Sequence, residues 1–470
     1  MGNSDSKTNN TQETISGLIK RLLVKGTQKQ FLLFFHRYHE ADIADALKDM
    51  SLEDQKLFFY RVKPELAAEV LEEMDVTFQL NLITEIKTER AAKFIEEMEP
   101  DEAVDLLEDL FLEDETKAEE IIDALPEEDA EDIRELLSYE EGTAGALMTS
   151  EYTWIPENLT VKQAVKSFRA QKPPDSEVSF YIFIVDEASH LVGYTTIREL
   201  VLSDLTQRVQ EVRKDYPVKV QASMDQEEVA KLFQKYDVVV MPVLDDEDCL
   251  VGIITVDDVV DVVVEEATED LYKLSGTSDI GESKLLHGKV VYAIWSRIPW
   301  LLMTVFGGII ASYVMKIYAE NLPIVSLVPL ALSLSFVPLL MGLGGNVGNQ
   351  SATIIVRALA TGELRENESF VIIAREVFVG LCIGVSLGGI VFLSLLLMDH
   401  SSPFSLIVSA SIVLNSLLAA LIGSSLPIIF KKFNIDPAIA SAPFISTSLD
   451  IIGQIVYFVL TMGAILYWFT

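Results

Sequence analysis

Residues 441–460, SAPFISTSLDIIGQIVYFVL, indicate a membrane-spanning helix and set the fold class of the whole chain. A helix needs about 20 mostly apolar residues to cross a bilayer. Asp450 lies inside this run and is the only charged residue after Asp436. A carboxylate at the centre of a membrane helix costs about 2.5–3.5 kcal/mol on insertion scales, so such a residue is by default functional. The alternative is a polar anchor bonded to a neighbouring helix.

Further apolar runs precede this one, and together they predict five membrane helices in a mainly α-helical protein. The runs cover 290–318, 324–341, 370–398, 404–430 and 443–470. Basic residues mark the cytoplasmic side of a membrane protein. The 342–369 and 431–442 connections contain Lys or Arg, whereas 319–323 and 399–403 contain none. We therefore expect a cytoplasmic N-terminal half and a C-terminus on the outside.

The charge of the chain is divided between its two halves. The net charge is -36, yet residues 285–470 contain as many acids as bases, so the excess lies in residues 1–284. An acidic half repels nucleic acid and attracts cations, although a solvated acidic surface is the simpler explanation. The N-terminus lacks the apolar core of a signal peptide. Two distant cysteines, Cys249 and Cys382, indicate neither a disulfide framework nor a thiolate metal site.

The acidic half begins with a repeat whose period is twelve residues, from HEADIADALKDM at residue 39 to EPDEAVDLLEDL ending at residue 110. The ninth and twelfth residues of each unit are apolar and share one helix face. Each unit therefore predicts a short helix and a turn, stacked into a solenoid that serves as an interaction surface. We place this domain at 15–138, after a disordered tail at 1–14.

A second repeat follows, in which YIFIVDEASHLVGYTTIREL resembles VVMPVLDDEDCLVGIITVDDV. Gly193 matches Gly252, and Thr196 matches Thr255. The pattern looks like a tandem CBS pair of α/β modules, with one copy at 143–208 and the other at 209–266. Such pairs often bind adenine nucleotides such as ATP between the copies. Thr255 and Asp258 are the candidate nucleotide-binding residues, but no glycine-rich phosphate loop accompanies them.

Two further segments contain groups that suit a hard cation. The helix predicted to leave the CBS pair is crowded with acids in its first part, namely Asp258, Asp261, Glu265, Glu266, Glu269 and Asp270. Carboxylate oxygens are the ligands that such cations prefer. In PLLMGLGGNVGNQSA, from residue 338, closely spaced glycines weaken a helix by roughly 1 kcal/mol each. We therefore expect non-helical backbone there, with carbonyl and carboxamide oxygens facing a wet cavity. The alternative is tight helix packing through small residues. Between residues 433 and 444, FNIDPAIASAPF fits either a kinked entrance or an ordinary loop.

These parts, in this order, resemble the MgtE family of magnesium channels over nearly the whole chain. The segment GGNVGNQSAT and the spaced pattern DPA…P…SLD, from Asp436 to Asp450, are specific to that family, whereas a CBS pair alone is not. The resemblance implies a homodimer in the bacterial cytoplasmic membrane, with one pore on the two-fold axis. It also implies a connecting or plug helix at 267–288 and a transmembrane domain at 289–470.

The resemblance further implies two groups of Mg²⁺ ligands. In the pore these are Asp450 and oxygens of Gly342, Gly345, Asn349 and Ala438. In the cytoplasmic domains, Mg²⁺ would bridge acids and hold the plug helix against the pore until the Mg²⁺ concentration falls. The regulatory acids implied are Asp225, Glu227, Asp237, Asp258, Glu266, Glu269 and Asp270.

Two other classes of function compete with a magnesium channel. A proton- or sodium-coupled carrier would use Asp450 as its exchanging group, but carriers usually contain inverted repeats, and we find none in the five predicted spans. An intramembrane aspartyl protease needs two carboxylates that share a proton, and Asp450 has no second acid at its depth. We therefore expect no enzymatic activity.

Overall fold

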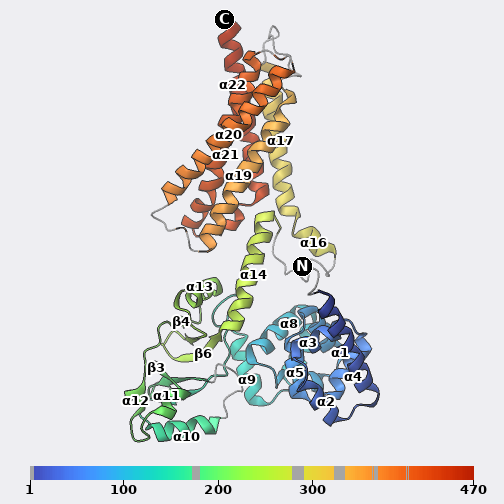
Figure 1. Ribbon diagram of the computed structural model, residues 1–470, viewed down its shortest axis with the longest axis vertical. Coiled ribbons are helices and arrows are strands. Elements are labelled where there is room, and N and C mark those ends of the chain that lie inside the picture. Colours follow the sequence, from blue (N-terminus) through green and yellow to red (C-terminus); the bar gives the residue numbers. More distant parts are fainter. Residues whose placement is uncertain are drawn as a thin grey trace. The chain divides into compact units, whose positions relative to one another are not determined.

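The computed structural model divides the chain into two compact units, Met1–Glu265 and Glu266–Thr470 (Figure 1). The residues that it describes are 5–171, 180–277, 290–321, 334–361, 364, 369–398, 400 and 402–469.

The first unit opens with a stack of short helices. They are α1 (Asp5–Lys25), α2 (Gln28–Phe35), α3 (Glu40–Lys48), α4 (Leu52–Arg61), α5 (Pro64–Glu72), α6 (Val76–Glu85), α7 (Thr88–Ile95), α8 (Pro100–Ile122) and α9 (Glu127–Leu136). From α3 to α8 each helix begins twelve residues after the one before it, as the repeat predicts. Alternate helices pack in two rows. In one row α3 packs on α5 and α5 on α7; in the other α4 packs on α6 and α6 on α8.

The apolar stripe of the repeat forms the core of this domain. The ninth residue of each unit is at most 2 % exposed and the twelfth at most 7 %; they are Leu47, Phe59, Leu71, Ile83, Ile95 and Leu107, then Met50, Val62, Met74, Ile86, Met98 and Leu110. The expected disordered tail is wrong for residues 5–14, because α1 begins at Asp5. Ile15, Ile19 and Leu23 bury one face of α1 at helical spacing, and the helix extends N-terminally from there.

The second repeat folds into two three-stranded α/β modules. The first contains β1 (Trp154–Pro156), α10 (Val161–Gln171), β2 (Tyr181–Val185), β3 (Leu191–Thr196) and α11 (Ile197–Leu202). After α12 (Val209–Val212), the second contains β4 (Val220–Gln221), α13 (Gln226–Tyr236), β5 (Val240–Leu244), β6 (Leu250–Thr255) and α14 (Val256–Ser275). In each sheet the first strand pairs parallel and the third antiparallel to the middle strand.

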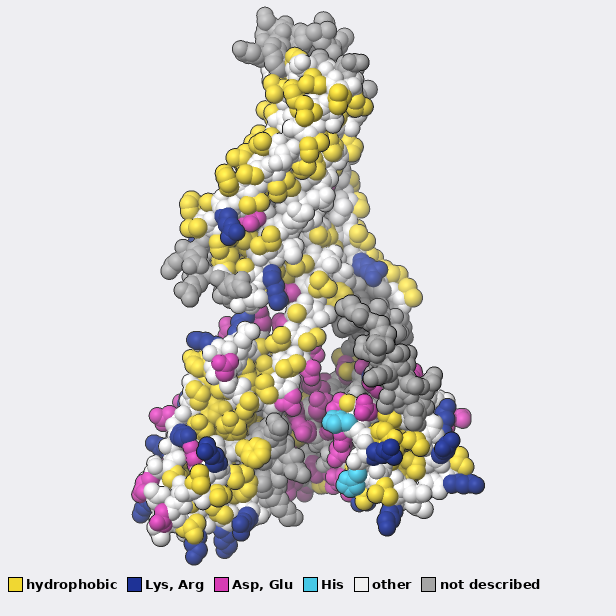
Figure 2. Space-filling view, viewed as in Figure 1, with side chains coloured by type: hydrophobic (Ala, Val, Ile, Leu, Met, Phe, Trp, Pro, Cys, Tyr) yellow, Lys and Arg dark blue, Asp and Glu magenta, His cyan; other side chains and the backbone are white. Residues whose placement is uncertain are grey.

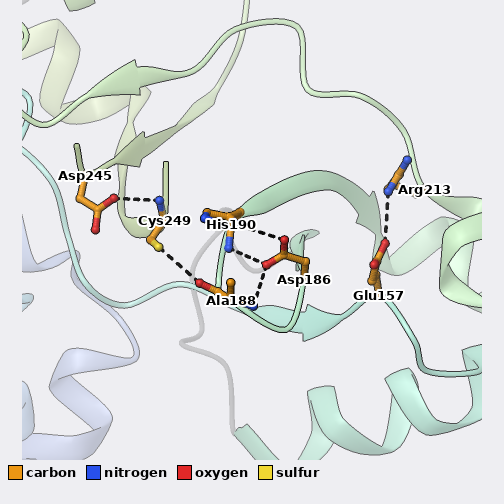
Figure 3. A network of polar contacts seen from close by, with 7 residues as sticks. All are labelled: Glu157, Asp186, Ala188, His190, Arg213, Asp245 and Cys249. Atoms are coloured by element: carbon orange, nitrogen blue, oxygen red, sulfur yellow. Dashed lines mark hydrogen bonds and ion pairs between the residues drawn. The ribbon is translucent and has the colours of Figure 1, made fainter. Parts of the chain in front are cut away.

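The two modules are duplicates in register as well as in topology. Gly193 faces Ile184 in one sheet and Gly252 faces Val243 in the other, and a register shift follows the middle-strand residue in both. The two acidic turns meet through a bridge between His190 and Cys249, where the thiol lies 3.4 Å from the Ala188 carbonyl oxygen (Figure 3). The duplication predicted from the sequence is therefore confirmed.

The boundary expected at residue 266 between the second module and a plug helix does not interrupt the backbone. α14 continues without a break from Val256 to Ser275. It ends at Gly276, whose φ of +74° is a left-handed conformation that glycine adopts without strain. The remaining residues of the expected plug helix, 278–288, lie outside the described residues.

The second unit is a bundle of long helices. It contains α16 (Val290–Trp295), α17 (Ile298–Asn321), α19 (Val337–Ala360), α20 (Ser369–Leu397), α21 (Ser402–Lys432), the short 3-10 helix η3 (Pro437–Ile439) and α22 (Ala442–Phe469). Four described segments are long and apolar enough to cross a membrane: Ile298–Glu320, Ser369–Leu397, Ser402–Lys432 and Ala442–Ala464. Much of the expected second span, 324–341, falls on residues 322–333, outside the described part of the chain. The acidic side chains gather on the first unit, and the visible face of the second is largely hydrophobic (Figure 2).

The repeat gives a stability prediction for the helical domain. Ile83 is fully buried, whereas Leu57 is 42 % exposed. We expect Ile83→Ala to cost about 2–5 kcal/mol, because it leaves a cavity in the stack, and Leu57→Ala to cost about 0.5 kcal/mol or less. Urea unfolding of the full chain in detergent, followed by far-UV circular dichroism, measures both. Equal midpoints for the two variants would contradict the assignment of the core.

Candidate functional site

The glycine-rich segment forms continuous α-helix, so the expected non-helical backbone is wrong. Residues 342–350 all lie within α19. The glycines serve close packing instead: a Cβ on Gly348 would lie 2.2 Å from a side-chain carbon of Leu449 in α22. A Cβ on Gly423 of α21 would lie 2.2 Å from the Gly348 carbonyl oxygen. The helices approach closely because these positions lack side chains, and this gain in packing offsets the low helix propensity of glycine.

The close approach brings Asn349 of α19 against α22 near Asp450. The Asn349 Nδ2 donates a hydrogen bond to Ser446 Oγ at 3.1 Å, and Gly345 packs against the same serine. Ser446 precedes Asp450 by four residues, so the two share one face of α22. The Asn349 Oδ1 is buried and has no hydrogen-bond partner among the described residues. Ser446 was not singled out from the sequence, where it is one of several small polar residues in STS.

Asp450 itself is half-buried in α22. Within the described part of the chain it forms no hydrogen bond or ion pair with another side chain, and Lys and Arg are absent from α22. The polar-anchor alternative requires a bond to a neighbouring helix, and no such bond is present among these residues. A charged carboxylate in an apolar bundle needs a counter-charge or water.

The other predicted pore residues lie in different surroundings. Gly342 is exposed, with open space where a side chain would be. It begins an exposed and mostly polar stripe along α19 that continues through Asn346, Gln350 and Thr353. Ala438 is fully buried in η3, and its backbone N–H donates to Asp436 Oδ1 at 2.8 Å. Only its carbonyl oxygen could therefore face an ion.

Asn415 of α21 is a further polar residue in the core of this bundle that the sequence analysis missed. It is 1 % exposed, and its Nδ2 donates to the Leu340 carbonyl oxygen of α19 at 2.8 Å. A Cβ on Gly344 or on Gly453 would lie within 2.7 Å of its carboxamide atoms. Asn415 therefore fills the space that these two glycines leave between α19 and α22.

A cluster of carboxylates lies on the first unit, where α8 approaches the start of α14. It comprises Glu99, Asp101, Glu102 and Asp105, which face Asp258. Loss of surrounding water, then repulsion from neighbouring carboxylates, raises the pKa of Glu99 to about 7, of Glu102 to about 8 and of Asp105 to about 7. Glu99 and Asp105 nevertheless lie exposed on the surface, so crowding of like charges is the firmer cause for these two. The same causes raise the pKa of Asp101 well above its usual range, and its buried Oδ1 has no partner among the described residues.

These four acids, Glu99 at the N-cap of α8 and three in its first turns, were not identified individually from the sequence. The signal was present, because EPDEAVD contains more acids than the opening of most other repeat units. Among the described residues, no three His, Cys, Asp or Glu side chains come close enough together to form a metal centre. Magnesium is commonly held by one or two carboxylates and keeps several of its waters. The cluster is therefore better suited to a hydrated ion than to a dehydrated one.

Several of the predicted regulatory acids already have partners within the chain. Asp225 caps α13 by accepting from the Glu227 backbone N–H at 2.9 Å, and Glu227 itself forms an ion pair with Lys231 at 2.7 Å. Asp237 ends α13 with a left-handed backbone. Glu269 forms an ion pair with Lys273, and Glu266 and Asp270 lie on the same helix, α14.

The two candidate nucleotide-binding residues bond each other. Both the backbone N–H and the hydroxyl of Thr255 donate to the Asp258 carboxylate, which closes the start of α14. Thr196 and Glu199 form the equivalent capping box at the start of α11. Burial raises the pKa of Asp258, and the bonds from Thr255 oppose that rise. The primary role of this pair in the structure is helix capping.

The chain resembles known magnesium transporters along most of its length. The MgtE intracellular N domain model matches residues 38–142, the CBS domain model matches 144–204 and 209–265, and the MgtE model, described as a divalent cation transporter, matches 337–460.

Individual relatives agree with these matches. The magnesium transporter MgtE of Thermus thermophilus is 37% identical over 358 residues, which cover 76% of this chain and 77% of that protein. The magnesium transporter MgtE of Bacillus subtilis is 32% identical, with 69% and 70% covered. A crystal structure of the soluble part of a magnesium transporter covers 55% of this chain and 99% of its own, at 30% identity and a TM-score of 0.51. The chain therefore belongs to the MgtE family of magnesium transporters.

Proposed function

We propose that the chain is a Mg²⁺-selective channel that imports Mg²⁺ across the cytoplasmic membrane and closes when cytoplasmic Mg²⁺ is abundant. The observation that carries the proposal is Asp450, a half-buried carboxylate with no partner among the described residues of an apolar bundle. The missing counter-charge is supplied by the transported ion. The relatives described above are named magnesium transporters, which supports a transport function for this chain in preference to an enzymatic one.

The proposed pore holds Mg²⁺ with its water shell largely intact. Mg²⁺ is small, demands octahedral geometry and dehydrates reluctantly, so a site that stripped its waters would slow conduction. Asp450 attracts the hydrated ion, and the unpartnered Oδ1 of Asn349 accepts a hydrogen bond from one of its waters. Backbone oxygens of Gly342, Gly345 and Ala438 complete the proposed lining.

We further propose a homodimer with five spans in each copy and the pore on the two-fold axis. The polar stripe of α19 supports this arrangement, because Gly342, Asn346, Gln350 and Thr353 are exposed on the second unit. Such groups are costly against lipid but suit a water-filled path. A second copy that packs around this stripe would enclose the path. With α19 as the second span, the N-terminus is cytoplasmic and the C-terminus lies outside.

The proposed gate is the mutual repulsion of the acidic cluster. Without Mg²⁺, the crowded carboxylates destabilise the packing of α8 against the start of α14. A hydrated Mg²⁺ between them removes that repulsion and favours the closed arrangement. We therefore place the main regulatory site at Asp258 and its α8 neighbours. The other proposed regulatory ligands are Asp225, Glu227, Asp237, Glu266, Glu269 and Asp270, several of which must first release the partners described above.

ATP remains a proposed ligand of the cleft between the two CBS copies, with Thr255 and Asp258 as its ribose contacts. Binding there would compete with the capping bond between the same two residues.

Neutralising the membrane carboxylate is the most direct test of the transport proposal. We expect Asp450→Asn to reduce Mg²⁺ flux into liposomes roughly tenfold or more, since each ~1.4 kcal/mol of lost attraction gives a factor of ten. Ser448→Ala is the matched control, because the Ser448 hydroxyl bonds only within α22 in the described structure. A Mg²⁺-sensitive dye inside the liposomes measures the flux. If Asp450→Asn transports as fast as Ser448→Ala, Asp450 does not line the ion path.

Removing one charge from the acidic cluster tests the gate. We expect Asp101→Asn to stabilise the Mg²⁺-free protein and to raise, by about threefold or more, the Mg²⁺ concentration needed for closure, because both repulsion and ion binding depend on that charge. Asp42→Asn, on an exposed residue outside the cluster, is the control. Thermal unfolding and flux, each titrated with Mg²⁺, measure the two effects. Identical titrations for both variants would remove the cluster from the sensor.

The raised pKa values predict a pH dependence. Between about pH 5 and 8 the folded cluster binds more protons than the unfolded chain, so stability without Mg²⁺ falls as the pH rises through the raised pKa values near 7 and 8. Mg²⁺ should therefore raise the melting temperature more at pH 8 than at pH 5.5, where protons already neutralise the carboxylates. Differential scanning calorimetry with and without Mg²⁺ at both pH values measures this. A Mg²⁺ effect that is larger at pH 5.5 would contradict it.

A further inference from the structure

The C-terminal end of α14 meets the connection between α21 and α22 through an ion pair within the second unit. The Lys273 ammonium lies 2.7 Å from Asp436 Oδ2 and also pairs with Glu269, one turn earlier in α14. The Lys273 side chain is 25% exposed, and those of Glu269 and Asp436 are each 32% exposed. A pair this sheltered is screened less by salt than an exposed one.

The two carboxylate oxygens of Asp436 have separate roles. Oδ1 accepts from the Ala438 backbone N–H at 2.8 Å and so begins η3, whereas Oδ2 accepts from Lys273 at 2.7 Å. η3 leads directly into α22, the helix that contains Asp450. The ion pair therefore connects α14 to the beginning of the proposed pore helix.

A close backbone approach accompanies the charge contact. Gly276 is buried directly after the end of α14, and a Cβ there would lie 2.4 Å from a ring carbon of Pro443 at the start of α22. The Thr277 N–H donates to the Tyr272 carbonyl oxygen at 2.9 Å, which closes the last turn of α14. The end of α14 is thus fixed in place by both shape and charge.

Lys273 is the cation of this contact. Burial disfavours its charge, but the bonds and attraction from Asp436 and Glu269 outweigh burial and raise the pKa of Lys273 above its usual value. The ammonium is therefore charged throughout the physiological pH range. Its place in the last turn of α14 also agrees with the favourable interaction of cations with helix C-termini.

We propose that Lys273 is a positioning residue of the gate: its ammonium is a built-in cation that holds the end of α14 on the α21–α22 connection without Mg²⁺. The inference rests on the proposed function, and deepens it by separating two contacts of α14. The acids at the start of α14 respond to Mg²⁺, whereas its end is held permanently by Lys273. Glu269 then balances the charge of Lys273, and Mg²⁺ binding at Glu269 would need Lys273 to leave.

Three substitutions isolate the ion pair. Lys273→Met keeps the aliphatic stem and removes the charge. Asp436→Asn removes the charge but keeps an oxygen that can cap η3. Lys273→Arg restores the charge. Lys316→Met is the control, because its ion pair with Glu320 in α17 is long, at 3.8 Å, and about two-thirds exposed on both sides.

The first measurement is Mg²⁺ flux of the full-length protein in liposomes, titrated with Mg²⁺ on the cytoplasmic side. We expect Lys273→Met and Asp436→Asn each to raise the half-closing Mg²⁺ concentration about three- to tenfold, with the double variant no worse than either single one. The maximal flux of both variants at low Mg²⁺ should equal that of the wild type. A general folding defect would instead lower this maximal flux. Lys273→Arg should return the midpoint to within about twofold of wild type.

The second measurement is hydrogen exchange of residues 270–277 in the same proteins, which reports docking of α14 independently of transport. Faster exchange in Lys273→Met and Asp436→Asn, and not in Lys316→Met, is the expected result. Unchanged exchange and an unchanged midpoint in Lys273→Met would overturn the inference, as would additive effects in the double variant. If Mg²⁺ flux through the wild-type protein does not fall as Mg²⁺ rises, the proposed gate is wrong. The hydrogen-exchange data alone would then decide whether Lys273 holds α14.

Discussion

Carboxylates without nearby positive charge impose the main constraint on this structure. Asp450 has no partner among the described residues of an apolar bundle, and the α8 acids face Asp258 at a cost large enough to shift their titration. Uncompensated charge of this kind must be balanced by protons, water or metal cations. We propose that the same deficit attracts the transported ion in the membrane and makes packing in the first unit depend on the concentration of that ion.

Glycine packing determines where the membrane carboxylate stands. Gly345 and Gly348 allow α22 to approach α19 so closely that Asn349 bonds Ser446, one turn before Asp450. Asn415 fills the space beside Gly344 and Gly453 and bonds the α19 backbone. The polar groups of the bundle are therefore held by helices in rigid contact, which fixes the position of Asp450 relative to the exposed stripe of α19.

Much of the fold follows from periodicity in the sequence. The twelve-residue repeat predicts the helix starts, because each unit holds one helix and its turn. It also predicts the buried positions, because the ninth and twelfth residues of a unit lie three apart and share one helix face. The duplicated strands are likewise predictable from matching residues such as Gly193 and Gly252. The glycine-rich segment was mispredicted because helix propensity is a local property, whereas the packing against Leu449 and Gly423 that stabilises α19 comes from elsewhere in the chain.

The site was predictable only in part, for a related reason. Asp450 stands out because charge is rare in an apolar run, so one residue carries the signal. Asp101 and Lys273 do not stand out among the many acids and bases of the sequence. Asp101 faces Asp258, 157 residues later in the chain, and Lys273 pairs with Asp436, 163 residues later. Contacts across such separations are set by the tertiary fold.

The central claim is that Mg²⁺ moves passively through this protein and itself closes the path. Electrical recording from liposomes with Mg²⁺ as the only permeant cation tests it most directly, while cytoplasmic Mg²⁺ is stepped from low to high. The account predicts a current that reverses at the Mg²⁺ equilibrium potential and disappears at high cytoplasmic Mg²⁺. Transport that requires a proton or sodium gradient, or a current indifferent to cytoplasmic Mg²⁺, would contradict it.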